Sequence, residues 1–148
     1  TEPSYGVWAR RGETTLCEDL IDENGSVNSR NHHFFGDISS WFIQSLAGIR
    51  YNPIRNNWKE VHIAPRFAES ISWAEGYHIC PQGRISSRWE KRENAIYLTL
   101  DIPEYMEGKI LLENGYVFSD GRHWKPVKSG KYEIVRKPDA LYYCETAK

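Results

Sequence analysis

Residues 95–102 alternate aliphatic side chains with other side chains along their whole length, a period of two that a half-buried β-strand requires. Ile96, Leu98 and Leu100 fall on one face of such a strand, and the residues between them fall on the other. Further strand patterns, separated by turn signals such as Pro81-Gln82-Gly83, occupy residues 60–64, 71–79, 84–90, 109–112 and 130–135. Short strands joined by turns predict an antiparallel β-sandwich rather than a parallel sheet.

The N-terminal part of the chain has a helical period instead. The segment Asp37–Ala47 places apolar side chains at three-and-four spacing, with Asp37 as the N-cap and Gly48 as the stop. A second, weaker helix is predicted over Tyr5–Arg11, and the polar stretch Glu23–Asn31 is predicted to be a loop. The fold class expected is therefore mainly β with a helical N-terminal part, divided into residues 1–57 and 58–148.

Composition argues against several classes of function. The 148 residues include 19 Lys and Arg against 20 Asp and Glu, for a formal charge of −1. This balance predicts that the chain binds neither nucleic acid nor an anionic membrane surface. No apolar run reaches the roughly 20 residues that a bilayer-spanning helix needs. Cys17, Cys80 and Cys144 are too few for a disulfide framework and lack the paired short spacing of a structural zinc site. Aromatic residues make up 14% of the chain, which suits either a sugar-binding surface or a large aromatic core.

The residues with the clearest chemical potential lie in the helical part. Glu13, Glu18 and Asp19 form a short acidic stretch, and the adjacent His32 and His33 come just before the predicted helix. A carboxylate near an imidazole and aromatic rings is the arrangement that sugar hydrolysis uses. Each residue also has a plain structural interpretation, as an exposed acidic stretch or as loop histidines. Adjacent histidines rarely serve one metal and no third ligand is apparent, so we predict no metal site and no cofactor.

Several short motifs follow one another in a fixed order along the chain. They include Gly12-x-Thr14-Thr15-Leu16-x-Glu18, Asn28-x-x-Asn31-His32, Phe35-Gly36-x-x-x-x-Trp41, Val61-x-Ile63-x-Pro65-Arg66, Trp73-Ala74-x-Gly76 and Pro81-x-Gly83-x-Ile85-x-x-x-Trp89. No single motif is specific, but the ordered series resembles the bacterial α-L-rhamnosidase family. The resemblance covers roughly residues 3–136, nearly the whole chain.

This resemblance implies an antiparallel β-sandwich preceded by the last helices of an α/α barrel, so that residues 1–57 would be the incomplete end of a catalytic (α/α)6 barrel. It implies an inverting glycosidase in which Glu18 is the general base, with His32, Asn31 and Cys17 at substrate-binding positions. Cys17 departs from the family, which commonly has Trp there, and the departure removes a ring that would contact the sugar. In the family, the general acid lies well upstream of this region.

Two consequences follow from that resemblance. Inverting hydrolysis needs two carboxyl groups on opposite sides of the scissile bond, so this chain by itself is expected to be inactive, and its carbohydrate substrate to bind only to the complete protein. The helix 37–47 would expose an apolar face meant for the missing barrel, which predicts self-association. A non-catalytic carbohydrate-binding module and a purely structural β-domain are the alternatives. The sequence carries no targeting signal that distinguishes the bacterial cytoplasm from the periplasm.

Overall fold

A computed structural model describes residues 4–19, 29–33, 36–52 and 57–137 of the chain. The chain forms two compact units, Thr1–Trp41 (unit 1) and Phe42–Lys148 (unit 2). The division falls earlier in the chain than residue 57, because β1 (Ile49–Tyr51) pairs with the sandwich. The expected boundary after residue 57 remains a prediction for the complete protein.

The described part of unit 1 contains the short helices α1 (Tyr5–Arg10) and α2 (Ile38–Trp41). Val7 and Trp8 form the buried side of α1, and the ring N–H of Trp8 donates to the backbone oxygen of Asp19 at 3.2 Å. The predicted helix 5–11 is thus confirmed. The predicted helix 37–47 is also present, but it changes its winding: α2 is followed directly by the π-helix η2 (Phe42–Leu46), which begins unit 2. Gly48, at a positive φ of 80°, lies just beyond its end.

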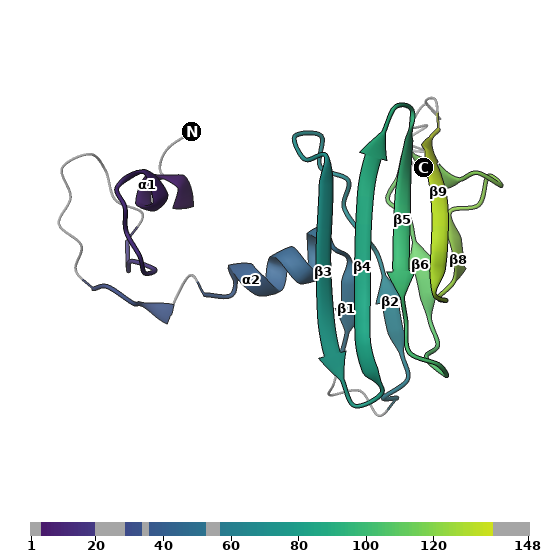
Figure 1. The fold of residues 1–148 in the computed structure, drawn as a ribbon, viewed down its shortest axis with the longest axis horizontal. Coiled ribbons are helices and arrows are strands. Elements are labelled where there is room, and N and C mark those ends of the chain that lie inside the picture. Colours follow the sequence, from purple (N-terminus) through teal and green to yellow (C-terminus); the bar gives the residue numbers. More distant parts are fainter. Residues whose placement is uncertain (1–3, 20–28, 34–35, 53–56, 138–148) are drawn as a thin grey trace, which may run out of the picture. The chain divides into compact units, whose positions relative to one another are not determined.

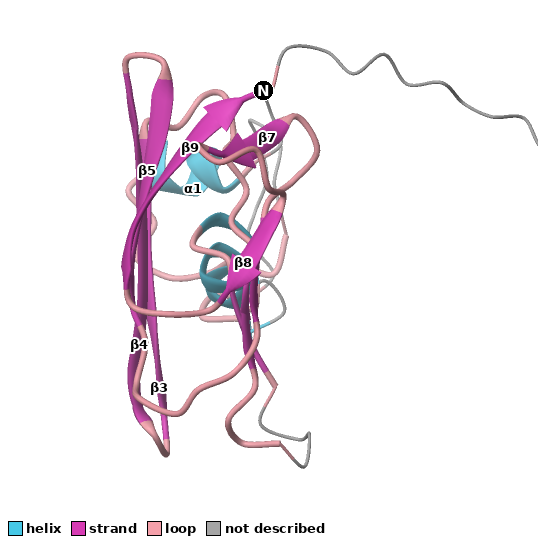
Figure 2. Ribbon diagram, turned by 90° about the vertical axis from the view of Figure 1, so that its right-hand side faces the viewer, coloured by secondary structure: helices cyan, strands magenta, loops and turns pink. Residues whose placement is uncertain are grey.

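Unit 2 is a sandwich of two sheets, seen face-on in Figure 1 and edge-on in Figure 2. The larger sheet has the order β3-β4-β5-β9-β7, from strands Trp73–Cys80, Gly83–Arg92, Ala95–Asp101, Gly130–Arg136 and Tyr116–Phe118. The smaller sheet has the order β1-β2-β6-β8, in which β2, β6 and β8 are Val61–Ile63, Lys109–Leu111 and Trp124–Pro126. All pairings are antiparallel except that of β2 with β6. The mainly β, antiparallel fold class is confirmed.

The core lies between the sheets and follows the alternation of the sequence. Ile96, Leu98 and Leu100 of β5 are buried, while the side chains between them are exposed. Trp89 of β4 is fully buried, and its ring N–H donates to the backbone oxygen of Leu46 at 2.7 Å. The end of η2 is thereby attached to the inner face of the larger sheet.

One glycine permits the parallel contact between β2 and β6. Gly108 has a φ of 147°, and a Cβ atom built on it would overlap the carbonyl oxygen of Val61 in β2.

We expect Gly108→Ala to lower the free energy of unfolding by about 3 kcal/mol, because the added methyl group would force β2 and β6 of the smaller sheet apart. Denaturant unfolding followed by circular dichroism measures the loss. Gly121→Ala is the matched control: its φ is also positive, at 83°, but nothing lies within 4 Å, so a loss of about 1 kcal/mol is expected. Equal losses in both variants would contradict the role of the β2 contact.

Candidate functional site

Backbone pairing in unit 1 brings the predicted site residues onto two neighbouring segments. Cys17 forms an isolated antiparallel bridge with Arg30. On either side of this bridge the Glu18 N–H donates to the Ser29 oxygen at 3.0 Å, and the His32 N–H donates to the Leu16 oxygen at 2.8 Å. The segment that carries Cys17 and Glu18 therefore lies beside the segment that carries Asn31 and His32, although about a dozen residues separate them in the sequence.

The four candidate side chains differ in their exposure. Asn31 is exposed, Glu18 and His32 are partly exposed, and Cys17 is fully buried. Asn31 has a left-handed backbone with a φ of 62°, a conformation that asparagine tolerates better than most residues, and its N–H donates to the Thr15 hydroxyl at 3.2 Å. Burial of Cys17 favours a packing role for its thiol, and its assignment as a sugar contact stays a prediction.

Two further contacts define the surroundings of these segments. Glu13 accepts from the Arg30 guanidinium at 3.4 Å, so this carboxylate already has a cationic partner. The rings of His32 and His33 are stacked, with centroids 5.4 Å apart and planes inclined by 14°. Within the described residues no three His, Cys, Asp or Glu side chains gather into a possible metal site.

The aromatic residues of the sandwich separate into a buried and an exposed set. The sequence leaves open whether Trp73, Tyr77, Trp89 and Trp124 form a core or a sugar platform, and its alternation favours the core for Trp89. Trp89 is indeed in the core, whereas Trp73 and Tyr77 on β3 are 53% and 52% exposed and Trp124 on β8 is 50% exposed.

An arginine covers each exposed ring of β3. The Arg88 guanidinium lies 4.9 Å from the Trp73 ring centroid, and that of Arg84 lies 4.2 Å from the Tyr77 ring centroid.

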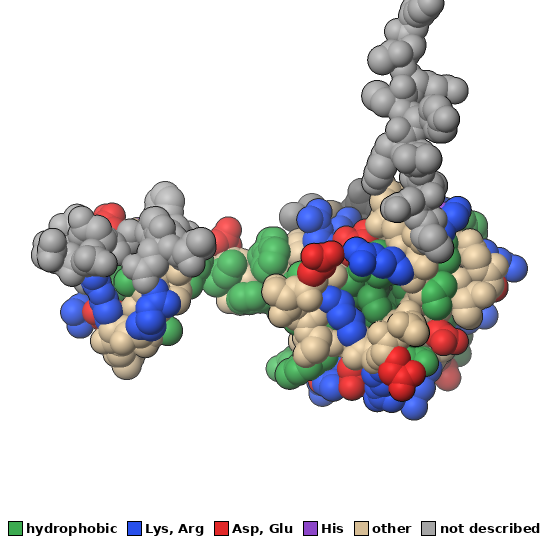
Figure 3. All heavy atoms as spheres, turned by 90° about the horizontal axis from the view of Figure 1, so that it is seen from above, with side chains coloured by type: hydrophobic (Ala, Val, Ile, Leu, Met, Phe, Trp, Pro, Cys, Tyr) green, Lys and Arg blue, Asp and Glu red, His purple; other side chains and the backbone are tan. Residues whose placement is uncertain are grey.

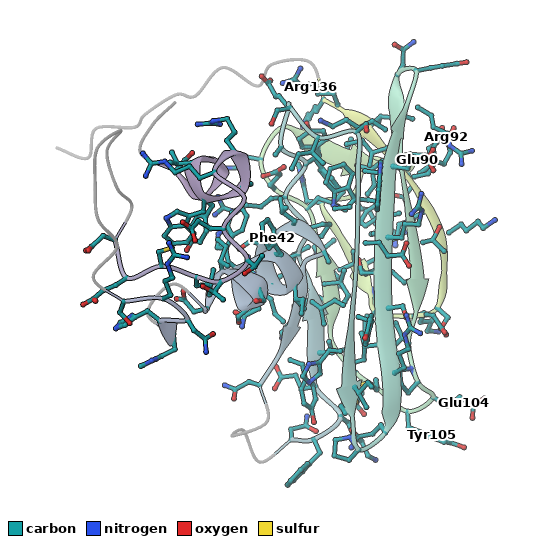
Figure 4. All side chains as sticks on the ribbon, turned by 60° about the vertical axis from the view of Figure 1, so that its left-hand side comes forward. Phe42, Glu90, Arg92, Glu104, Tyr105 and Arg136 are labelled. Atoms are coloured by element: carbon teal, nitrogen blue, oxygen red, sulfur yellow. The ribbon has the colours of Figure 1, made fainter. Side chains whose placement is uncertain are left out.

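Arginines on this sheet also form ion pairs with carboxylates, as Arg92 does with Glu90 at 3.0 Å (Figure 4). The hydrogen bond from Arg92 lowers the pKa of the Glu90 carboxyl below its ordinary value. Figure 3 shows cationic and anionic side chains interspersed over the surface of unit 2. Sequence reasoning on single residues missed these pairs. The contacts of Arg84 and Arg88 with β3 depend on the register of β3 with β4, whereas Glu90 and Arg92 are two residues apart on the same strand.

Two apolar side chains at the junction of α2 and η2 are half exposed, Trp41 at 48% and Phe42 at 50%. Phe42 projects from the helical segment in Figure 4. They match the expectation of an apolar helix surface, but self-association through it remains a prediction. In the described part of the chain no helix has the length and apolar character needed to cross a membrane.

Comparison with known proteins identifies two family domains in succession. Residues 1–46 match the bacterial alpha-L-rhamnosidase 6 hairpin glycosidase domain, and residues 48–117 match the bacterial alpha-L-rhamnosidase C-terminal domain. An alpha-L-rhamnosidase of Streptomyces avermitilis is 32% identical over 70% of this chain and 10% of its own length. One from Formosa agariphila is 30% identical over 90% of this chain and 16% of its own length. The chain thus spans a small part of these relatives.

Solved structures agree with this assignment. The alpha-L-rhamnosidase of Dictyoglumus thermophilum superposes with a TM-score of 0.72 at 23% identity, over 93% of this chain and 18% of that one. The Streptomyces avermitilis enzyme, solved in complex with L-rhamnose, superposes with a TM-score of 0.71 at 24% identity, over 93% of this chain and 15% of that one. At these identities the likeness concerns the fold. The two consecutive domain matches, together with the relatives of 30% and 32% identity, show that the chain belongs to the bacterial α-L-rhamnosidase family.

Proposed function

We propose that this chain is the C-terminal part of an inverting glycoside hydrolase that removes terminal α-L-rhamnose from glycosides. The observation that carries the proposal is the pairing of residues 16–18 with residues 29–32 inside the segment that matches the glycosidase domain. This pairing supplies a carboxylate and an imidazole from adjacent strands of backbone. A sugar-cleaving site needs such groups side by side.

In this proposal Glu18 is the general base. A base must be ionised and must reach the attacking water, which suits the partly exposed Glu18 better than Glu13, already paired with Arg30. His32 and Asn31 then contact sugar hydroxyls, since imidazole and amide groups both donate and accept hydrogen bonds. Cys17 is fully buried. At this position the shape of the sugar pocket would differ from that of relatives that carry a larger residue there.

The general acid must come from the rest of the protein. In inverting enzymes the two carboxyl groups stand about 6.5–9.5 Å apart, with the bond to be cleaved between them. The complete barrel would supply the second group. Residues 1–57 would then be the closing part of the barrel and residues 58–148 the sandwich domain.

Assays of the complete protein and of the 148-residue chain with an aryl α-L-rhamnoside test this proposal. We expect turnover by the complete protein and none by the chain alone, because the chain lacks the general acid. Turnover by the isolated chain would contradict the need for an upstream acid. Absence of turnover by the folded complete protein would remove rhamnoside hydrolysis as its function.

A second candidate function, carbohydrate binding without catalysis, is favoured by the half-exposed rings of β3. If the outer face of the larger sheet binds neutral glycans, Trp73→Ala should weaken retention of the chain in glycan-containing affinity gels about tenfold, since a stacked ring contributes roughly 1–3 kcal/mol. Trp124→Ala is the matched control. Its ring is equally exposed and also faces a cation, Lys109 at 4.8 Å, but it lies on the other sheet. Equal retention of both variants would count against this function.

A further inference from the structure

The smaller sheet carries a hollow of about 320 Å³ to which none of the roles above applies. Arg50 of β1, Arg66 beyond β2 and Glu113 beyond β6 contribute its charged groups. Its remaining lining is apolar and comes from Ala64, Pro65, Leu111 and Leu112. A hollow of this size that combines apolar lining with charged groups can take a small molecule.

The two arginines of the hollow stand apart from the others of unit 2. The remaining arginines described in this unit each have an ion pair or a ring contact: Arg84, Arg88, Arg92, Arg122 and Arg136. Among the described residues, neither Arg50 nor Arg66 has a side-chain partner of this kind. Two arginines without such partners in the lining of one hollow favour a bound anion.

Glu113 adds a second kind of recognition. Its Oε1 atom accepts the backbone N–H of Phe67 at 2.8 Å, which holds the carboxylate in place at the hollow. The other carboxylate oxygen can accept from a hydroxyl group of a ligand. Leu111, which is 38% exposed, offers apolar contact of the kind that the C–H face of a sugar ring makes. The hollow thus combines two cations for an acid group, one acceptor for hydroxyls and an apolar wall.

We propose that this hollow binds an acidic saccharide, with the carboxylate of a hexuronic acid unit between Arg50 and Arg66 and a hydroxyl donating to Glu113. The choice of a saccharide among hydroxy acids rests on the proposed function, whereas the acid group follows from the arginines alone. The site lies in unit 2, outside the residues assigned to catalysis, so its ligand is not the sugar that is cleaved.

Titration of the isotopically labelled 148-residue chain with glucuronate, glucose and inorganic sulfate, followed by amide NMR shifts, tests the proposal. Glucose matches glucuronate except for the carboxylate, and sulfate offers charge without hydroxyls. We expect glucuronate to bind in the millimolar range, with the shifts centred on residues 50, 66 and 113, and glucose and sulfate to bind at least tenfold more weakly. Equal binding of glucose would overturn the role of the carboxylate. Equal binding of sulfate would leave an anion site without preference for saccharides, and would overturn the ligand class.

Charge-removing variants locate the site. Arg50→Gln and Arg66→Gln should each weaken glucuronate binding at least tenfold, while their melting curves stay those of the wild type because both side chains are exposed. Arg122→Gln is the control: this arginine is 70% exposed and pairs with Asp120 away from the hollow, so binding should not change. Wild-type affinity in the Arg50→Gln and Arg66→Gln chains would place the ligand elsewhere and refute the proposal. Since binding is read without hydrolysis, this outcome is separate from a failure of the glycosidase function.

Discussion

Glu18→Gln in the complete protein is expected to lower the rate of aryl α-L-rhamnoside hydrolysis by roughly 10²-fold or more. The substitution preserves the size of the side chain, but it replaces one acceptor oxygen by an NH2 group and removes the negative charge that takes a proton from water. The backbone bond from Glu18 N–H to Ser29 should hold the segment in place, so the loss should fall on kcat rather than on folding. Measurement of kcat and KM with a chromogenic rhamnoside checks the prediction.

Glu13→Gln is the matched control for that experiment. Glu13 lies in the same acidic stretch, but its carboxylate already bonds to Arg30, and the loss of such a partly exposed ion pair costs little. We expect its activity to stay within about threefold of the wild type. Wild-type activity in Glu18→Gln would mean that Glu18 belongs only to an acidic loop. If the wild-type protein itself does not cleave the substrate, Cys17 marks a changed specificity and carbohydrate binding becomes the better hypothesis.

Trp89→Ala is expected to lower the free energy of unfolding of the sandwich by about 3–5 kcal/mol. The side chain is fully buried, its ring meets that of Phe67 edge-on at 5.4 Å, and its N–H bonds to Leu46. Its removal leaves a cavity between the sheets and also loses the attachment of η2. Urea unfolding followed by far-ultraviolet circular dichroism measures the loss independently of tryptophan fluorescence.

Two variants separate the parts of this effect. Trp89→Phe retains most of the apolar volume but loses the donor to Leu46, so a smaller loss of about 1–3 kcal/mol is expected. Trp73→Ala removes the same type of residue from the exposed face of the sheet and should change stability by less than about 1 kcal/mol. A loss in Trp73→Ala as large as that in Trp89→Ala would show that the two faces of the sheet do not differ as the burial pattern indicates.

The long strands were predictable because their alternation is a local property. The period of two in residues 95–102 predicted which side chains of β5 enter the core, and the same alternation placed Trp89 inside. The three-residue strands β1, β7 and β8 were not predicted, whereas the equally short β2 and β6 lie inside the longer strand patterns predicted at residues 60–64 and 109–112. The unpredicted strands form because a neighbouring strand pairs with each of them: β2 with β1, β6 with β8 and β9 with β7.

The candidate site was predictable only as a set of residue types. Residue types and their order were enough to predict that the second part of the chain is an antiparallel sandwich and that the ordered motifs resemble those of one family. The roles of Glu18 and His32 in sugar hydrolysis are implied by that resemblance and remain proposals. Three-dimensional packing was needed to show that Cys17 pairs with Arg30, and that Arg50, Arg66 and Glu113 share one hollow. The difference comes from distance along the chain: periodicity and capping depend on near neighbours, whereas a hollow or a bridge depends on segments that only long-range hydrogen bonding and packing bring together.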